Sequence, residues 1–194
     1  TIIINILKKK FNNLMKVIGF AGSNSKNSIN KRLVKYTLGK LDNAEIELLD
    51  LNDFDTPVYS IDKENEDGYP EKIQKFVTTI QSADGLIISL AEHNGAYTAA
   101  FKNLMDWCSS YELKFLKRMP MFLLSTSPGG YGGGNVMELA LKRLPQFDAN
   151  IISHFSLPKF GDNFKENEGI IDKSLSEEFF DAFGKFQDEL NQSR

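Results

Sequence analysis

Three short segments rich in serine, asparagine and glycine are the parts of this chain whose residue types suit ligand binding. They are residues 22–30, 91–95 and 125–130. Each follows an apolar run that is typical of a buried strand, and the first two also precede segments with helical spacing. Open parallel sheets bind ligands at the carboxyl ends of their strands, where such segments lie. We therefore predict that one ligand contacts all three segments.

The first segment has the chemistry of an anion site. It offers hydroxyl and amide groups from Ser23, Ser25, Ser28 and Asn30, and backbone N–H groups where a helix begins near Ile29. Helix N-termini attract anions because their free N–H groups and the macrodipole both point outward. The fit is to a phosphate monoester, since the segment has neither the Gly-Lys-Ser/Thr end of a Walker loop nor the Gly-x-Gly-x-x-Gly of a dinucleotide site. A polar loop with an ordinary serine cap is the alternative.

The second segment combines donors and acceptors with a flexible backbone. Its residues are Ala91, Glu92, His93, Asn94 and Gly95. The glycine permits unusual backbone angles, and the simpler interpretation of Asn94-Gly95 is a tight turn. His93 is a possible acid–base group, but the sequence shows no partner for it, so we favour a positional role. We predict no catalytic side chain and no metal ligand.

The third segment exposes backbone N–H groups, and its glycines let a flat ring approach closely. Its residues are Ser127, Pro128, Gly129 and Gly130. Glycines continue at residues 132–134, which indicates either a mobile edge or close backbone contact. The aromatic residues that could stack on a ring are Trp107, Tyr111 and Tyr131. For Trp107, which lies off the apolar stripe of its helix, packing or an interface is an equal alternative.

Five β–α units position these segments. Strands are predicted at residues 16–21, 45–51, 85–90 and 121–124 and from Asn150 onward. Helices are predicted after the cap Ser28, after Pro70, and around the apolar stripes 97–108, 136–144 and 175–190, with polar connections at 52–69 and 158–172. Continuous apolar strands alternating with helices predict an α/β fold, a parallel sheet covered on both faces. The flavodoxin-like order 2-1-3-4-5 places its switch point between strands 1 and 3, which the first two segments follow. We therefore predict a three-layer sandwich with this order.

The composition narrows the classes of function. The 194 residues suit one domain, and the net charge of -3 with no basic stripe gives no reason to expect a nucleic-acid partner. The single cysteine, Cys108, favours a reducing compartment, the cytoplasm, and fits a buried apolar residue better than a nucleophile. No apolar run approaches the roughly 20 residues of a membrane span, so no membrane partner is predicted. The carboxylates Glu64, Glu66 and Asp67 fit a solvated loop better than a metal site.

Residues 1–14 are predicted to be an extension outside the fold core, and residues 15–194 to be the domain. An apolar stretch at residues 2–7 precedes three lysines, the reverse of the order in a secretory signal. Met15 directly precedes the first predicted strand and is a natural start of the domain. A short extra strand or a flexible arm is the alternative for the extension.

The three segments, taken together and in order, resemble the NADPH-dependent FMN reductase family. The motifs that carry the resemblance are Gly22-Ser23 with Ser28 and Asn30, Glu92-His93-Asn94-Gly95 with Lys102-Asn103 and Asp106-Trp107, and Ser125-Thr126-Ser127-Pro128-Gly129-Gly130. The similarity extends from about Met15 to the last helix. It implies a flavodoxin-like fold, bound FMN, and hydride transfer from NAD(P)H through the flavin to a free flavin, a quinone, an azo compound or a metal oxyanion.

The resemblance also implies roles for individual residues. It places Ser23, Ser28 and Asn30 at the FMN phosphate, residues 92–95 along the ribityl chain and the ring, and residues 127–130 at the pyrimidine edge. Ser25 stands where many relatives have arginine, His93 where a tyrosine is common, and Ala91 where a proline is common.

Two other classes of function stay open at this point. A flavodoxin-like electron carrier has the same fold without NAD(P)H turnover, and a protein that binds FMN weakly and acts through partners is the third class. The resemblance further implies a homodimer or homotetramer whose interface lines the flavin site. Trp107 and the connection 52–69 are the candidates for that interface.

Overall fold

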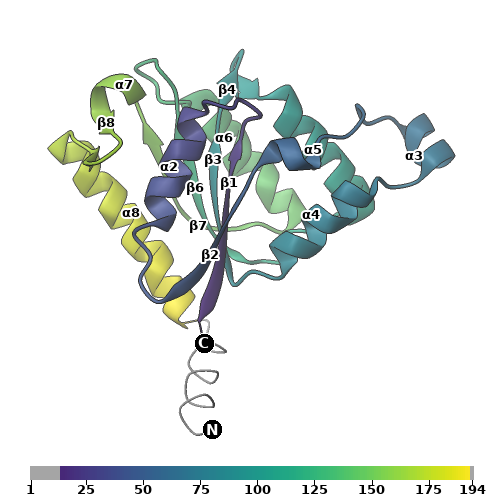
Figure 1. Cartoon of the computed structure of the whole chain (residues 1–194), viewed down its shortest axis with the longest axis horizontal. Coiled ribbons are helices and arrows are strands. Elements are labelled where there is room, and N and C mark those ends of the chain that lie inside the picture. The colour runs from purple at the N-terminus through teal and green to yellow at the C-terminus, as the bar shows by residue number, and fades with distance from the viewer. Residues whose placement is uncertain (1–13, 193–194) are drawn as a thin grey trace, which may run out of the picture.

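A five-stranded parallel sheet forms the centre of the molecule (Figure 1). The structure is a computed structural model and describes residues 14–192, so the predicted extension lies outside the described residues except for Leu14. The strands of the sheet are β1 (Met15–Gly22), β2 (Ala44–Leu49), β3 (Gly85–Leu90), β6 (Pro120–Thr126) and β7 (Asn150–Leu157). Their order is β2-β1-β3-β6-β7 and every pair is parallel, which confirms the predicted flavodoxin-like order.

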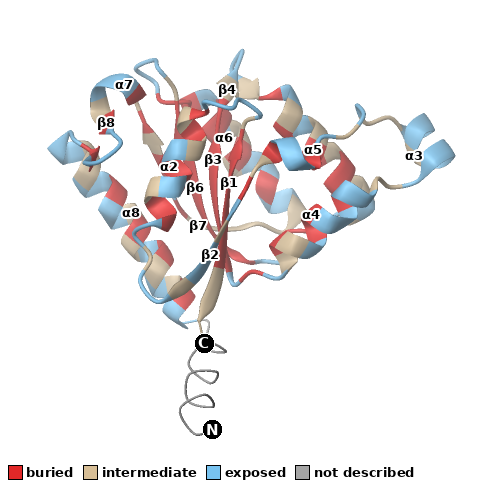
Figure 2. Ribbon diagram, in the orientation of Figure 1, coloured by how far each residue is buried: buried red, intermediate tan, exposed pale blue. Residues whose placement is uncertain are grey.

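Helices cover both faces of the sheet and complete the three layers (Figure 1). The helices are α2 (Ile29–Leu38) and α8 (Lys173–Gln192) on one face, and α4 (Glu71–Gln81), α5 (Ala99–Tyr111) and α6 (Gly134–Arg143) on the other. Successive side chains of a strand point to opposite faces, so Val17 joins the apolar core under α2 and α8, while Ile18 joins the core under α4, α5 and α6. Figure 2 shows that the inner strands are buried along their length, whereas β2 lies at an edge and is largely accessible. No helix within residues 14–192 is long and apolar enough to span a bilayer.

The two connections predicted to be polar contain short elements that the sequence did not indicate. The first holds a 3-10 helix (Leu51–Phe54) and α3 (Ile61–Asp67), and the second holds α7 (Phe160–Asn163) and the hairpin of β8 (Phe164–Lys165) and β9 (Gly169–Ile170). A second 3-10 helix, Leu144–Phe147, follows α6. No residue of α3 is buried, so its sequence has no apolar periodicity that would predict a helix. The strands β8 and β9 have two residues each, which is too short to show the alternation of a strand.

Trp107 is a core residue. Its side chain is only 1% exposed, and its indole Nε1 donates a hydrogen bond to the Pro57 carbonyl oxygen at 2.8 Å. The ring meets that of Tyr59 edge-on, with centroids 5.0 Å apart. Of the two alternatives for this residue, the structure therefore supports packing. Trp107 holds the connection before α4 against α5.

Candidate functional site

The structure brings the three predicted segments together at one edge of the sheet. Gly22 at the end of β1 pairs with Leu90 at the end of β3, and Leu90 pairs with Ser125 in β6. The residues that follow therefore leave three adjacent parallel strands at the same level. The geometry matches the switch point at which open α/β sheets bind ligands.

The N-terminus of α2 provides the anion-binding part of this edge. Ser28 is the N-cap, as predicted, and its Oγ accepts a hydrogen bond from the backbone N–H of Lys31 at 3.1 Å. The first turn holds no acidic residue, and its leading N–H groups have no helical carbonyl to pair with. Ser28 is 6% exposed, yet its hydroxyl proton has no acceptor among residues 14–192. This buried donor beside free N–H groups fits a phosphate.

The rest of the first segment adds donors and no carboxylate. The backbone N–H of Ser25 donates to Ser23 Oγ at 3.2 Å, and the Ser25 carbonyl accepts from Ser28 N at 3.2 Å, so the segment forms a compact turn. Its residues 24–27 are exposed. The cation Lys31, the third residue of α2, is bonded to Asp50 and lowers the pKa of that carboxyl. Hydroxyls, amides and the exposed Lys26, with no carboxylate in the segment itself, thus surround the helix end, and such donors suit an FMN phosphate.

Asn30 differs from the other residues predicted at the phosphate, because its side chain points into the protein. It is 2% exposed, and its Oδ1 accepts from the backbone N–H of Thr126 at 3.1 Å and from Ser89 Oγ at 2.7 Å. Its Nδ2 donates to the Thr126 carbonyl oxygen at 3.1 Å. The amide therefore joins the start of α2 to the ends of β3 and β6. The backbone N–H of Asn30, in the first turn of α2, faces the anion site.

The second segment forms a tight hairpin, as its simpler interpretation predicted. The strands β4 (Glu92–His93) and β5 (Ala96–Tyr97) flank Asn94 and Gly95, whose φ angles of 52° and 74° fit the two-residue turn that Asn-Gly favours. His93 is exposed and has no hydrogen-bond partner in the described part of the chain, so the structure offers it no acid–base relay. Ala91, just before the hairpin, is 8% exposed and packs at the strand end.

Glu92 fixes this hairpin to the N-terminus of α6. One carboxylate oxygen accepts from the backbone N–H of Val136 at 3.0 Å, and the other accepts from Asn135 Nδ2 at 3.0 Å. A carboxylate at a helix N-terminus is stabilised by the free N–H groups and the macrodipole. Glu92 therefore links the second segment to the helix that follows the third.

The third segment uses its carbonyl groups to hold its shape. The Ser127 carbonyl accepts from Phe160 N at 3.1 Å, and the Gly129 carbonyl accepts from Lys159 N at 2.9 Å. Residues 128–130 are exposed, and the N–H groups of Gly129 and Gly130 meet no protein acceptor within the described chain. These donors lie on an accessible, glycine-lined surface that a flat ring can approach.

Two threonines whose hydroxyl groups frame the site had no role assigned from the sequence. Thr98, the N-cap of α5, donates from Oγ1 to the Gly22 carbonyl oxygen at 2.9 Å, and Thr126 Oγ1 donates to the Leu157 carbonyl oxygen at 2.7 Å. Both threonines are 1% exposed. The sequence signal for such hydrogen bonds was the presence of Ser89, Ser125 and Thr126 within otherwise apolar strands, since buried hydroxyl groups need hydrogen-bond partners.

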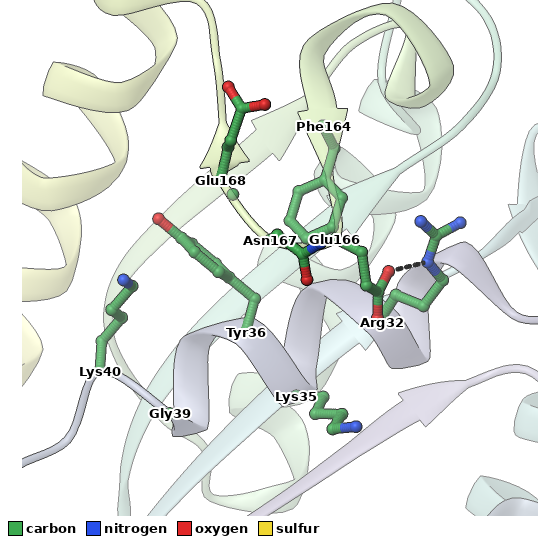
Figure 3. A pocket seen from close by; sticks show the side chains of 10 residues that line it. Arg32, Lys35, Tyr36, Gly39, Lys40, Phe164, Glu166, Asn167 and Glu168 are labelled. Carbon is green, nitrogen blue, oxygen red and sulfur yellow. Dashed lines mark hydrogen bonds and ion pairs between the residues drawn. The ribbon is translucent and has the colours of Figure 1, made fainter.

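A separate cleft of about 400 Å³ lies between α2 and the β8–β9 hairpin (Figure 3). Its lining includes none of the predicted site residues. Arg32 Nε pairs with Glu166 Oε2 at 2.8 Å across one end, and the other charged side chains do not converge on a point (Figure 3). Tyr36 occupies its floor, where burial raises the pKa of its hydroxyl. Hydrogen-bond donors gather at the site where β1, β3 and β6 end, and not in this cleft.

Comparison with known proteins identifies the family. Residues 15–162 match the family described as NADPH-dependent FMN reductase. This chain belongs to that family. Among similar proteins are a quinone reductase of Escherichia coli (strain K12), 27% identical over 183 residues with 89% of this chain and 95% of that protein covered, and an NADPH azoreductase of Bacillus sp. (strain OY1-2), 31% identical over 138 residues with 71% and 73% covered.

The fold of the family is shared with solved flavoenzymes. The FerB flavoenzyme NAD(P)H:(acceptor) oxidoreductase from Paracoccus denitrificans superposes with a TM-score of 0.72 at 23% identity, covering 92% of this chain and 98% of that one. Membership in the NADPH-dependent FMN reductase family makes the protein an oxidoreductase that uses FMN and NAD(P)H. The donor set at the N-terminus of α2 is consistent with that cofactor.

Proposed function

We propose that this reductase binds FMN across the three segments and transfers hydride from NAD(P)H through it to a small acceptor such as a quinone, an azo compound or a free flavin. The observation that carries the proposal is the buried Ser28 hydroxyl, whose proton has no acceptor among residues 14–192, at the N-terminus of α2, whose first turn holds no acidic residue, level with two other polar strand ends. When bound, FMN supplies the ability to accept a hydride and to pass electrons to a second substrate.

In this proposal the residues of the protein bind FMN and orient it. The Ser28 hydroxyl, the N–H groups of Ile29 and Asn30, and the hydroxyls of Ser23 and Ser25 hold the phosphate. Residues 91–95 lie along the ribityl chain and the ring. The N–H groups at residues 129–130 donate to the pyrimidine edge, a position from which hydrogen bonds tune a flavin. No side chain is assigned as an acid or a base.

The choice of acceptor is supported by the names of related proteins. A quinone reductase, an NADPH azoreductase and an NADH-dependent flavin reductase subunit are among them. All three acceptors are planar conjugated molecules. We therefore place planar two-electron acceptors first among the substrates to be tested.

The decisive experiment is an absorption spectrum of the purified protein, loaded with FMN where needed, followed by anaerobic NADPH in the same cuvette. We expect flavin bands that bleach within seconds and return when 1,4-naphthoquinone is added. The same titration with NADH measures the preference between the two nucleotides. Bands that persist after both nucleotides would instead support an electron carrier, and a protein that takes up no FMN would contradict the proposed site.

We also propose that the protein is a homodimer or homotetramer, with an arm made of residues 55–69 at the interface. Figure 1 shows α3, in the middle of this arm, projecting from the body of the molecule. Val58 is 79% exposed and Ile61 is 57% exposed. Exposed apolar side chains on a projecting arm fit contact with a second copy of the chain.

The base of the arm is firmly attached, which suits a preformed interface. Asn103 Oδ1 accepts from the backbone N–H of Tyr59 at 2.8 Å. Glu64 accepts hydrogen bonds from Ser110 and from the Tyr69 hydroxyl, and these bonds lower the pKa of the Glu64 carboxyl. These hydrogen bonds, to Ser110 of α5 and to Tyr69 at the end of the arm, hold the arm against α5.

Charges placed at the two exposed apolar residues of the arm are expected to dissociate the oligomer. The double variant Val58→Glu, Ile61→Glu should sediment as a monomer, because burying these carboxylates at an interface is costly. Sedimentation velocity at several concentrations measures the outcome. Lys63→Glu, an exposed change on the same helix, is the control and should leave the oligomer intact. A parent protein that is monomeric, or a double variant that stays associated, would contradict the proposed interface.

Two further points remain proposals. We infer that the fold core begins at Met15, where the family match also begins, and that residues 1–14 are an extension. We place the protein in the cytoplasm, because its single cysteine, Cys108, cannot form an internal disulfide, which favours a reducing compartment.

A further inference from the structure

Tyr131 is a large aromatic side chain that is held in place while its ring remains open to solvent. The residue is 59% exposed, and its hydroxyl donates a hydrogen bond to Glu138 Oε1 at 2.8 Å. The carboxylate raises the pKa of Tyr131, so the hydroxyl keeps the proton that it donates. A tethered aromatic ring offers contact area with little loss of conformational freedom on binding.

Each glycine at residues 132–134 makes a close contact, and the last of them, Gly134, supports this ring. Gly132 has a φ of 62°, and a Cβ there would lie 2.9 Å from Leu157 C, so the backbone approaches too closely for a side chain. A Cβ at Gly134 would lie 2.5 Å from Cε1 and Cζ of Tyr131. The ring therefore rests on the first turn of α6, where only glycine leaves room for it. Of the two interpretations that the sequence left open for this run, the structure supports close backbone contact.

The ring of Tyr131 lies beside the proposed flavin site. Tyr131 directly follows residues 128–130, whose exposed backbone is the proposed contact for the flavin ring. Of the three aromatic residues considered from the sequence, Trp107 is buried and Tyr111 packs on Tyr69 at a centroid distance of 5.2 Å. Tyr131 is thus the one of these three that adjoins the strand-end segments with an open face.

We propose that the ring of Tyr131 forms one wall of the acceptor site and stacks on planar acceptors such as quinones. This inference rests on the proposed function and adds a residue that determines acceptor specificity. Stacking on a fixed aromatic face favours flat conjugated molecules over acceptors without a flat face, because only the former bury area against the ring. Glu138 and Gly134 are positioning residues, since they act by holding the ring.

The test compares acceptors on FMN-loaded protein. We expect Tyr131→Ala to raise the ratio of KM for 1,4-naphthoquinone to KM for ferricyanide about five- to tenfold, while Tyr131→Phe restores the low ratio because the ring is kept. Gly134→Ala should raise the ratio as well, since its Cβ displaces the ring without removing it. Tyr111→Ala, an exposed tyrosine on α5, is the matched control.

A binding measurement provides a readout that does not depend on turnover. The redox-inert planar ligand 2-naphthol should bind FMN-loaded Tyr131→Ala about five- to tenfold more weakly than the parent in a calorimetric titration. FMN affinity, measured first by fluorescence, separates the two proposals. A Tyr131→Ala protein with parental FMN affinity, KM ratio and 2-naphthol affinity would overturn the role of Tyr131 alone. Failure of the parent to bind FMN would overturn the proposed function and this inference with it.

Discussion

Replacing Asn30 with alanine is expected to weaken the binding of FMN and of riboflavin alike and to destabilise the protein. The substitution leaves the N–H and C=O of Thr126 and the hydroxyl of Ser89 without their partner at a site that is 2% exposed in the parent. Each buried polar group left unpaired costs roughly 1–3 kcal/mol, so we expect a loss of at least about 3 kcal/mol in the free energy of unfolding.

The loss of flavin affinity follows from the geometry. Asn30 connects the start of α2 to Thr126, the last residue of β6, so without it the first and third segments are no longer held in register. Because the ring contacts move together with the phosphate contacts, the Kd values for FMN and for riboflavin should both rise by roughly tenfold or more. Fluorescence titration of the apoprotein and urea unfolding measure the two effects.

The matched control for Asn30 is Asn27 in the same segment. Asn27 is exposed, and its side chain has no hydrogen-bond partner among the residues that the structure describes. Asn27→Ala should leave the midpoint of unfolding and the affinity for riboflavin unchanged. If Asn30→Ala behaved as Asn27→Ala does, the connecting role of Asn30 would be wrong, however clear the hydrogen bonds are.

The features that could be predicted from the sequence are those set by long periodic segments or by local turn chemistry. Apolar runs such as residues 85–90 and the placement of polar segments after them were enough to indicate the strand order, because a parallel sheet buries its strands on both faces. The cap at Ser28 and the turn at Asn94-Gly95 depend on neighbouring residues only, so the structure confirmed both.

The direction of the Asn30 side chain could not be predicted in the same way. An asparagine in the first turn of a helix fits an inward bond to a strand end as well as an outward contact with a phosphate. The choice is made by Thr126, which is 96 positions away and reaches Asn30 only through the pairing of β1 with β3 and of β3 with β6. Glu92 is a second case, since its partners Asn135 and Val136 lie more than forty positions later.

The burial of Trp107 could not be predicted from helical spacing. Trp107 lies beside the apolar stripe of its helix and not on it, so the sequence left an interface and packing as equal alternatives. The arm before α4 folds back over this side of α5 and covers it, with the Pro57 carbonyl accepting from the indole. A loop without periodicity thus converts an exposed helix position into a core position, and its path is set by contacts such as Asn103 to Tyr59.

The second large effect concerns the phosphate alone. Ser28→Ala is expected to weaken FMN binding by roughly 10- to 100-fold, the value of one hydrogen bond to a charged group. Riboflavin, which has no phosphate, should bind the variant and the parent equally well. The contrast with Asn30→Ala, which lowers both affinities, separates a residue that contacts the phosphate from one that positions the segments.

Ser28 is also the N-cap of α2, so its loss has a structural cost that the experiment must separate from binding. Removing a serine cap costs roughly 0.5–2 kcal/mol of stability. Asn30→Ala, by comparison, is expected to lower the free energy of unfolding by more than that and to weaken the binding of riboflavin as well. Ser28→Thr retains both the cap and the hydroxyl and should bind FMN within a few-fold of the parent. Equal losses of FMN and riboflavin affinity in Ser28→Ala would show that the cap, and not a phosphate contact, is what this hydroxyl contributes, because only a direct bond to the phosphate can distinguish the two ligands.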